Sequence, residues 1–211
     1  MHTNFSPDSL ITPNQLVRKC EAAGLNCIAV TDHNTIQGAM EIRNIAPFRV
    51  NIGEEIRTSE GEVIGLFLEE KVPAGLSPKE TANRIHSQGG LLAIPHPFDK
   101  FRRSVITQRC LLDLRNYATI LEAFNARNTF QSSNQNALKL AQEWGTLTSA
   151  VSDAHTTIEL GRTYMEMPDF DGTSAGFIES VSQSRLVMRP ITPLIHVLTT
   201  LTKIWKRTTI T

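Results

Sequence analysis

Imidazole, carboxylate and amide side chains recur in this sequence directly after short apolar runs. In chain order, each run and the polar segment that follows it are Cys27–Val30 with Thr31–His33, Val50–Ile52 with Gly53–Glu55, Leu91–Ile94 with Pro95–Pro97, Ile120–Phe124 with Asn125, and Leu147–Val151 with Ser152–His155. Imidazoles and carboxylates together form the ligand set for zinc, manganese or iron, and several of each fit a multinuclear site. If the runs end side by side, these segments predict a metal centre.

Four of the six histidines belong to this pattern or stand at the start of the chain, namely His2, His33, His96 and His155. A single histidine at the end of a strand is more often a hydrogen-bonded structural residue than a ligand. The recurrence of imidazole and carboxylate at successive run ends favours metal binding for the set as a whole.

The helices that separate the apolar runs are marked by their caps. Thr12 is the expected N-cap of the first helix, with Pro13 at its first position, Gln15 completing a capping box, and Gly24 ending it. Further helices are expected over 77–89, which repeats this pattern, over 134–144, and after residue 172. These helices alternate with runs of strand length.

The fold class predicted from this alternation is α/β. Runs that are apolar almost throughout indicate a parallel sheet covered on both faces, and segment 62–68 adds one more extended stretch. In a parallel α/β barrel the carboxyl ends of the strands share one face, and that face carries the active site. The polar segments would therefore converge there.

Composition narrows the class of protein. The chain has 211 residues, 40% of them hydrophobic, which suits one domain with a sizeable core, and its 21 basic and 21 acidic residues give a formal net charge of zero. The even charge balance argues against a stable nucleic-acid complex. The three cysteines form no CxxC pair, and neither a signal peptide nor a membrane-spanning run is visible. We expect a cytoplasmic protein; its oligomeric state is left open.

Five ordered motifs resemble the PHP domain family, named for polymerase and histidinol phosphatase. They read "HTNFSPDS", "TDHNT", "GEEI", "PHPF" and "SDAH". The resemblance runs from Met1 to about Arg189, so a PHP domain is expected over 1–190 and a C-terminal appendage over 191–211. It implies a distorted, usually seven-stranded (β/α) barrel of TIM-like type. It also implies divalent cofactors, two or three ions of manganese, zinc or iron.

Metal ligands follow from the resemblance position by position. It implies a first set of His2, Glu55 and Asp153, a second set of Glu55 and His96, and a third set of Asp8, His33 and His155, with Glu55, His96 and Asp153 as the catalytic residues. Glu54 competes with Glu55 for the bridging role, but Glu54 would point to the opposite face of an extended strand. Asp32 could be either a ligand or an acceptor that orients its neighbours.

The start of the chain departs from the family pattern. The family begins with a strand that ends in His-x-His, and His2 matches the second of these histidines, so the first histidine and its strand are missing. A start site placed too far downstream, or a fragment, is one explanation, and a real loss of one ligand is the other. A barrel without one strand has an unpaired edge and should be less stable.

The activity implied by the resemblance is metal-dependent hydrolysis of a phosphate ester by metal-activated hydroxide. The expected substrate is a small phosphorylated molecule, with nucleotides as the first to test; a truncated or degenerate non-catalytic module is the alternative. The residues expected to bind substrate are Arg102, Arg103, Asn125 and Arg127. For the two neighbouring arginines a solvated basic loop is the competing interpretation.

The C-terminal segment predicts an amphipathic helix. Its apolar residues at helical spacing are Leu194, Leu198, Leu201 and Trp205, and no acidic residue follows Arg185. We expect the apolar face to pack on the barrel and the basic residues to face water. A membrane-surface or nucleic-acid contact is the alternative. His196, in this segment, is expected not to bind metal.

Overall fold

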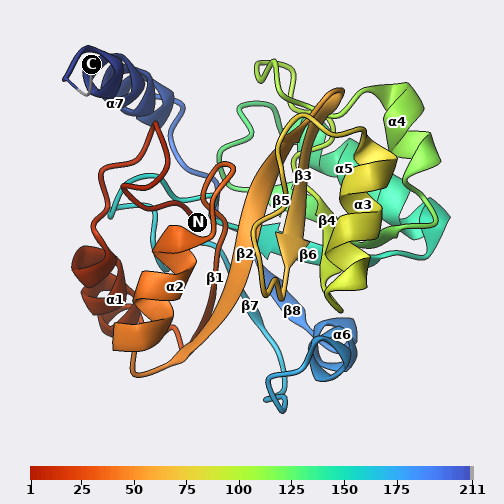
Figure 1. The fold of residues 1–211 in the computed structure, drawn as a ribbon, viewed down its shortest axis with the longest axis horizontal. Helices are drawn as coiled ribbons and strands as arrows, with labels where there is room; N and C mark the ends of the chain where they lie inside the picture. The colour runs from red at the N-terminus through yellow and green to blue at the C-terminus, as the bar shows by residue number, and fades with distance from the viewer. Residues whose placement is uncertain (210–211) are drawn as a thin grey trace.

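The computed structural model describes residues 1–209, and its centre is a curled sheet of six strands flanked by helices (Figure 1). In spatial order these strands are β1 (Cys27–Val30), β2 (Arg49–Thr58), β3 (Gly61–Leu66), β4 (Leu91–Ile94), β5 (Ala118–Asn125) and β6 (Leu147–Val151). A separate two-stranded sheet consists of β7 (Tyr164–Glu166) and β8 (Arg185–Val187). The architecture is the predicted α/β class, with the sheet curled into a half-open barrel.

The sheet is not parallel throughout, which corrects the prediction. β1–β2, β4–β5 and β5–β6 pair in parallel, whereas β3 is antiparallel to both β2 and β4. The cause is local, because β2 and β3 are joined by a tight turn that permits only antiparallel pairing. Gly61 closes this turn with a φ of 127°, and a Cβ there would lie 2.3 Å from the Cα of Ile106. β3 therefore starts at the edge where β2 ends.

The capped helices form where the sequence predicts them. In α1 (Pro13–Ala22) and α3 (Pro78–Ser87), Thr12 and Ser77 each complete a capping box. The third and fourth expected helices are α5 (Gln131–Trp144) and α6 (Ser174–Ser182). Two helices were not predicted, α2 (Gln37–Ile45) and α4 (Gln108–Asp113). α2 has no side-chain cap and α4 has only six residues, so both carry weak local signals.

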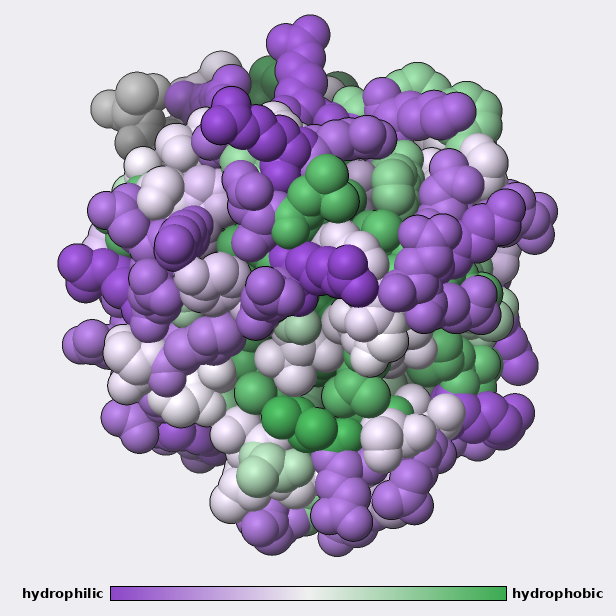
Figure 2. Space-filling model, turned by 90° about the vertical axis from the view of Figure 1, so that its right-hand side faces the viewer, coloured by the Kyte–Doolittle hydropathy of each residue, from purple (hydrophilic) through white to green (hydrophobic). Residues whose placement is uncertain are grey.

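Apolar side chains form two clusters. The larger one contains residues from each of α1 to α5, including Leu16, Ile42, Ile85, Leu111 and Ala141. The smaller one consists of Ile64, Leu66, Leu91, Ala93 and Ile120, with Phe177 of α6 packed against it. Seen from the side of α3, α4 and α5, the surface is largely hydrophilic, with hydrophobic residues gathered near its centre and lower half (Figure 2). The two clusters make the curled sheet a rigid frame for the segments at its edge.

The first residues of the chain lie between the two edge strands, β1 and β6. The amide of Thr31 donates to the carbonyl of Met1 over 3.0 Å, and the amide of His2 donates to the carbonyl of Ala154 over 2.8 Å. Below this short link the sheet is open, as the sequence predicts. The opening is a cavity of about 570 Å³ whose lining includes Met1 and residues 27–29 and 149–151. These two hydrogen bonds place His2 at the carboxyl ends of both β1 and β6.

The C-terminal helix α7 (Ile195–Thr209) is present, but the predicted packing of its apolar face is wrong. The residues of the predicted apolar face are more than half exposed, with values of 73% for Leu194, 51% for Leu198, 57% for Leu201 and 55% for Trp205, whereas Ile195 at the start of the helix is 1% exposed. The opposite, polar face contacts the protein, where Lys206 donates to backbone carbonyls. The physical reason is that the surface beneath α7 consists of polar loops, which need hydrogen-bond donors rather than hydrocarbon. Within residues 1–209 no helix has both the length and the apolar character needed to cross a bilayer.

Candidate metal centre

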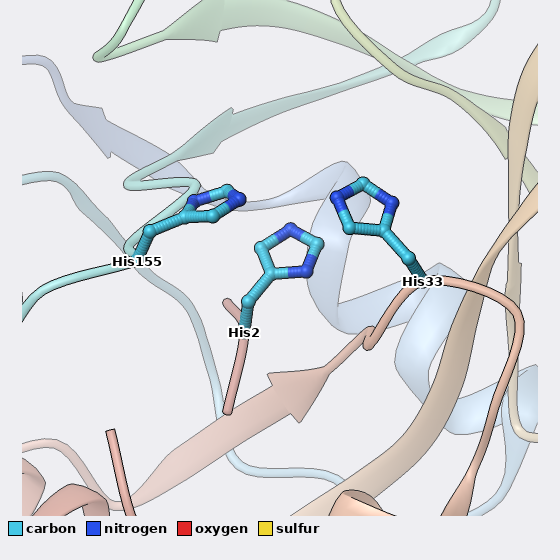
Figure 3. Close-up of side chains that lie close together, drawn as sticks. All are labelled: His2, His33 and His155. Carbon is cyan, nitrogen blue, oxygen red and sulfur yellow. The ribbon is translucent and has the colours of Figure 1, made fainter. Parts of the chain in front are cut away.

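The predicted ligands converge at the carboxyl edge of the sheet. They come from the N-terminal link (His2), the loop after it (Asp8), the segment after β1 (His33), β2 (Glu55), the loop after β4 (His96) and the loop after β6 (Asp153 and His155). Figure 3 shows three of the imidazoles, and the rings of His33 and His155 lie on either side of His2, at centroid distances of 4.6 and 4.1 Å. Side chains separated by as many as 153 positions thus form one cluster.

The first set, His2, Glu55 and Asp153, has the spacing of a metal site. His2 Nε2 lies 3.1 Å from Asp153 Oδ1 and 3.2 Å from Glu55 Oε2. Two atoms that bind one cation at about 2.1 Å, with octahedral or tetrahedral angles, lie roughly 3.0–3.4 Å apart. All three side chains are buried. The geometry therefore fits a divalent cation between them.

Hydrogen bonds to the other ring nitrogen of His2 fix its tautomer. The Ser6 hydroxyl donates to Asp32 over 2.7 Å and lies 3.2 Å from His2 Nδ1, so its oxygen accepts a hydrogen bond from the protonated Nδ1. A neutral His2 then presents the Nε2 lone pair to two carboxylates. Burial opposes protonation, but the Asp153 and Glu55 carboxylates raise the pKa of His2 above its ordinary value. A proton or a metal cation is needed at this position.

Asp32 orients this loop and does not contact the cluster. Its carboxylate accepts hydrogen bonds from the amide and hydroxyl of Thr3, each 2.6 Å long, as well as from Ser6. A Cβ at Gly38 would lie 2.1 Å from Asp32 Oδ2, so helix α2 approaches the carboxylate at a residue without a side chain. Of the two interpretations left open for Asp32, the contacts support the orienting one.

In the third set, the imidazoles of His33 and His155 face the carboxylate of Asp8. Asp8 lies 3.6 Å from His33 Nε2 and 3.5 Å from His155 Nε2, and Asp8 Oδ1 is buried without a hydrogen-bond partner. His155 Nδ1 lies 2.8 Å from the Asp153 carbonyl, to which it donates. Burial and the neighbouring His2 hold the pKa of His155 well below its ordinary value, so its Nε2 is unprotonated. A neutral imidazole facing a carboxylate leaves a place for a cation.

The cluster gains a residue that the sequence analysis missed, Glu62, which lies with Glu55 and His33. His96 Nε2 lies 3.1 Å from Glu55 Oε1, and Glu62 of β3 offers a carboxylate oxygen within 4.8 Å of ligand atoms of Glu55 and His33. Glu62 is 8% exposed, and its Oε2 has no hydrogen-bond partner. It stands at the start of a strand rather than after its end. Only the antiparallel direction of β3 brings it to this edge, so no rule based on parallel strands could find it.

Backbone strain is concentrated at the same edge. Among the described residues other than glycine, φ is positive at Asn34, His96, Asp153 and Phe67, with values of 55°, 29°, 49° and 58°. The first three are ligands of the predicted sets or a direct neighbour of one. Such conformations cost on the order of 1–3 kcal/mol each and persist where the surrounding structure fixes them. The strain is typical of a functional site.

The residues expected to bind substrate divide into two groups. Arg102 contacts Asp153 and, over 3.2 Å, Asp99, and the amide of Asn125 donates to Asp153 over 3.3 Å, so both lie at the cluster. Arg103 is exposed. Arg127 is 4% exposed and pairs with Glu159 over 3.1 Å rather than with a carboxylate of the predicted ligands. The structure therefore gives Arg127 a different set of partners from the one expected.

Glu54 and Glu55 point to opposite faces of β2, as the alternation predicts. Glu54 is fully buried on the far side, where its Oε2 accepts a hydrogen bond from the amide of Val72 over 2.8 Å. Burial raises the pKa of Glu54 to about 7. Glu55, by contrast, is surrounded by His2, His33 and His96, which hold its pKa well below the ordinary value despite burial. Of the two glutamates, only Glu55 faces the cluster.

Fold and site together define a metal-binding barrel, and comparison with known proteins assigns its family. The PHP domain profile matches residues 1–71, and a profile described as PHP-associated matches residues 131–186. Uncharacterized protein MJ1587 of Methanocaldococcus jannaschii is 42% identical over 139 residues, which cover 60% of this chain and 79% of that protein. The chain belongs to the PHP domain family.

Solved structures resemble the fold at low sequence identity. A two-domain protein from Bacteroides vulgatus, described as containing a predicted PHP-like metal-dependent phosphoesterase, matches with a TM-score of 0.72 at 16% identity. The match covers 90% of this chain and 63% of that one, so this chain spans less than two thirds of that protein. An amidohydrolase from Chromobacterium violaceum, solved with bound sulfate and no metal, matches with a TM-score of 0.61 at 15% identity over 93% of both chains.

The cluster predicts how stability depends on pH when metal is removed. Burial lowers the pKa of His33, but Glu55 and Asp8 outweigh it and raise the pKa from 6.5 to about 9. The stabilisation from protonated His33 is therefore complete below about pH 6.5 and is lost as the pH rises through about 9. In excess chelator, we expect the free energy of unfolding to fall by roughly 1–3 kcal/mol over this range. Urea unfolding at successive pH values measures it.

The matched control for this pH dependence is His33→Gln, which should flatten the decline because it removes the titrating group. Saturating manganese should remove the decline as well, since metal binds the deprotonated imidazole. A stability of the chelated wild-type protein that stays constant between pH 6.5 and 9 would contradict the prediction.

Proposed function

We propose that this protein is a metal-dependent hydrolase that cleaves a phosphate ester of a small phosphorylated substrate. The observation that carries the proposal is the convergence of imidazoles and carboxylates at metal-ligand spacing. His2 Nε2 lies 3.2 Å from Glu55 and 3.1 Å from Asp153, and His155 Nε2 lies 3.5 Å from Asp8 Oδ1, which is buried without a hydrogen-bond partner. Divalent cations bound there would supply a water of lowered pKa and neutralise charge on the phosphate. Manganese, zinc and iron all suit this mixture of imidazole and carboxylate.

The side chains themselves account for positioning. Glu55 faces His2 through one oxygen and His96 through the other, so it can be shared between two ions. Ser6 and Asp32 hold the His2 ring in place. His2, Glu55 and His96 are each at most 2% exposed, and burial strengthens the charge interactions between them. These features support hydrolysis by metal-assisted displacement, without a serine or cysteine nucleophile.

Arg102 is the residue that we propose for recognition of the phosphate. Its guanidinium already contacts the carboxylates of Asp153 and Asp99, at the centre of the cluster. An arginine can bind two oxygens of a phosphate in the same planar manner. Nucleotides and sugar phosphates are the first substrates to test. The bound sulfate reported for the Chromobacterium protein supports a site for a tetrahedral anion in this fold.

We also propose that the protein acts in the cytoplasm. Cys20, Cys27 and Cys110 form no disulfide. Burial raises the pKa of the Cys20 thiol to about 11, so this cysteine is a structural residue rather than a reactive one. Unpaired, buried thiols are typical of a reducing compartment.

The deciding experiment is an assay of the purified protein on a panel of phosphomonoesters and phosphodiesters, with and without added manganese. We expect metal-dependent release of phosphate or alcohol that chelator abolishes. Arg102→Ala should raise KM by roughly 10-fold or more because it removes a charged contact to the phosphate. Arg103→Ala, one position along and exposed, is the matched control and should leave KM unchanged.

A protein that binds metal but hydrolyses nothing on the panel would support the non-catalytic alternative. If Arg102→Ala and Arg103→Ala raise KM equally, the arginines act through general positive charge and the proposed contact is wrong.

A further inference from the structure

We infer that helix α7 is a clamp that positions the third set of metal ligands, Asp8, His33 and His155. The inference rests on the metal binding of the proposed function and extends it to a segment outside the barrel. α7 lies over the N-terminal loop at one side of the molecule (Figure 1). Its polar face contacts the loop that carries Asp8 directly and the loop that carries His155 through Arg127, and no predicted ligand comes from α7 itself.

The contact to the first loop is made by two lysines. Lys206 Nζ donates to the carbonyls of Asn4 and Ser6, each over 2.7 Å, and Lys203 Nζ lies 3.9 Å from Asp8 Oδ2. These contacts lie between His2 and Asp8 in the sequence. One ammonium group thus holds the backbone of the loop that connects a ligand of the first set with a ligand of the third.

The contact to the second loop passes through Arg127. His196 Nε2 donates to the Arg127 carbonyl over 2.9 Å, and Arg127 Nη2 donates to the Thr199 hydroxyl over 2.9 Å. Thr199 is 8% exposed and Arg127 is 4% exposed. Both groups are therefore shielded from water, where a hydrogen bond is stronger and a lost partner is costly.

Arg127 in turn fixes the loop that carries His155. Its Nη1 donates to Glu159 Oε1 over 3.1 Å, and Glu159 Oε2 accepts the amide of His155 over 3.0 Å and that of Thr156 over 2.8 Å. A charged acceptor for two consecutive amides sets the direction of the His155 backbone. The chain of contacts runs without a break from Thr199 of α7 to a predicted metal ligand.

The manner of attachment explains why these polar contacts matter. Hydrocarbon packing holds only the start of α7, where Ile195 is 1% exposed, because the later large apolar residues of the helix are more than half exposed. Its position depends on Lys206, His196 and Thr199. Removing any of these contacts should let the two loops move relative to each other. The third set takes one ligand from each loop, Asp8 from the first and His155 from the second.

The test compares manganese binding by the wild-type chain of 211 residues with two variants, Thr199→Val and Lys206→Met. Each keeps the size of the side chain and removes one polar contact to a loop. We expect one class of bound manganese to weaken by about 10- to 100-fold, the usual effect of losing a residue that orients a ligand, while the remaining ions bind as in the wild type. Calorimetric titration and metal analysis at fixed free manganese measure this.

Thr200→Val is the matched control, since its hydroxyl bonds only to the carbonyl of His196 within α7. It should bind manganese as the wild type does. Hydrogen exchange provides a second measurement, with faster exchange expected in residues 4–8 and 153–159 of the two test variants but not of the control.

Two results would overturn the clamp. One is unchanged manganese affinity in both test variants, and the other is an equal weakening of every bound ion, which would indicate general destabilisation. A wild-type protein that binds no divalent ion would overturn the proposed function itself, and the clamp with it, so the two failures are distinguishable.

Discussion

Glu55→Gln should reduce metal-dependent hydrolysis by roughly a thousandfold or more and should lower the number of bound ions. Glu55 contacts His2 and His96 through different oxygens and is 2% exposed. Removing its charge leaves two proposed metal positions without their shared anion. Metal ions in such sites contribute several kcal/mol to catalysis, and about 4 kcal/mol corresponds to a thousandfold change in rate. Steady-state kinetics and metal analysis measure the effect.

The matched control is Glu54→Gln, which changes the adjacent, equally buried glutamate on the other face of β2. This variant should keep the metal content and activity of the wild type. At pH 8 it should be as stable or more stable, because the pKa of Glu54 is raised to about 7 and its charged form is unfavourable in the fold. If Glu54→Gln loses metal and Glu55→Gln does not, the assignment of the bridging carboxylate is wrong.

An extension of about six apolar, β-branched residues ahead of Met1 should stabilise the protein by on the order of 3 kcal/mol. The facing edges of β1 and β6 are joined only by Met1 and His2, and a cavity of about 570 Å³ lies below this link. An added strand would pair with both edges, and its side chains would fill the cavity. For a chain of this size, such a gain raises Tm by about 6–12 °C, which thermal unfolding in chelator measures.

The control is a glycine and serine extension of the same length. It removes the charged amino group from its position 3.3 Å from the Ala29 carbonyl but supplies no side chains for the cavity. It should change Tm much less than the apolar extension does. Equal Tm values for the two extended proteins would contradict the idea that the gap accepts a strand.

The sequence by itself determined the local elements and most of the side chains that meet at the candidate site. Capping boxes at Thr12 and Ser77 mark α1 and α3 because they depend on residues only three positions apart. The predicted ligands His33, His96, Asp153 and His155 lie just after strand ends, and those positions can be seen in the apolar pattern. Alternation along one strand was enough to separate Glu55 from Glu54, since neighbouring residues point to opposite faces.

Tertiary structure alone decided which further side chains join the site. Glu62 reaches it because β3 runs antiparallel between β2 and β4, and strand direction depends on pairing partners rather than on the strand's own residues. Arg127 follows a strand end, as several ligands do. It turns instead to Glu159, 32 positions away, and the buried ion pair fixes its direction.

The orientation of α7 was also decided by the tertiary structure and not by its own sequence. Its sequence has an apolar face and a basic face, and periodicity shows that the faces exist without showing which one meets the protein. That depends on the surface beneath, which consists of carbonyls of residues 4 and 6, Asp8 and Arg127. Groups of this kind need hydrogen-bonding and charged partners, so the polar face turns inward and the leucines turn outward.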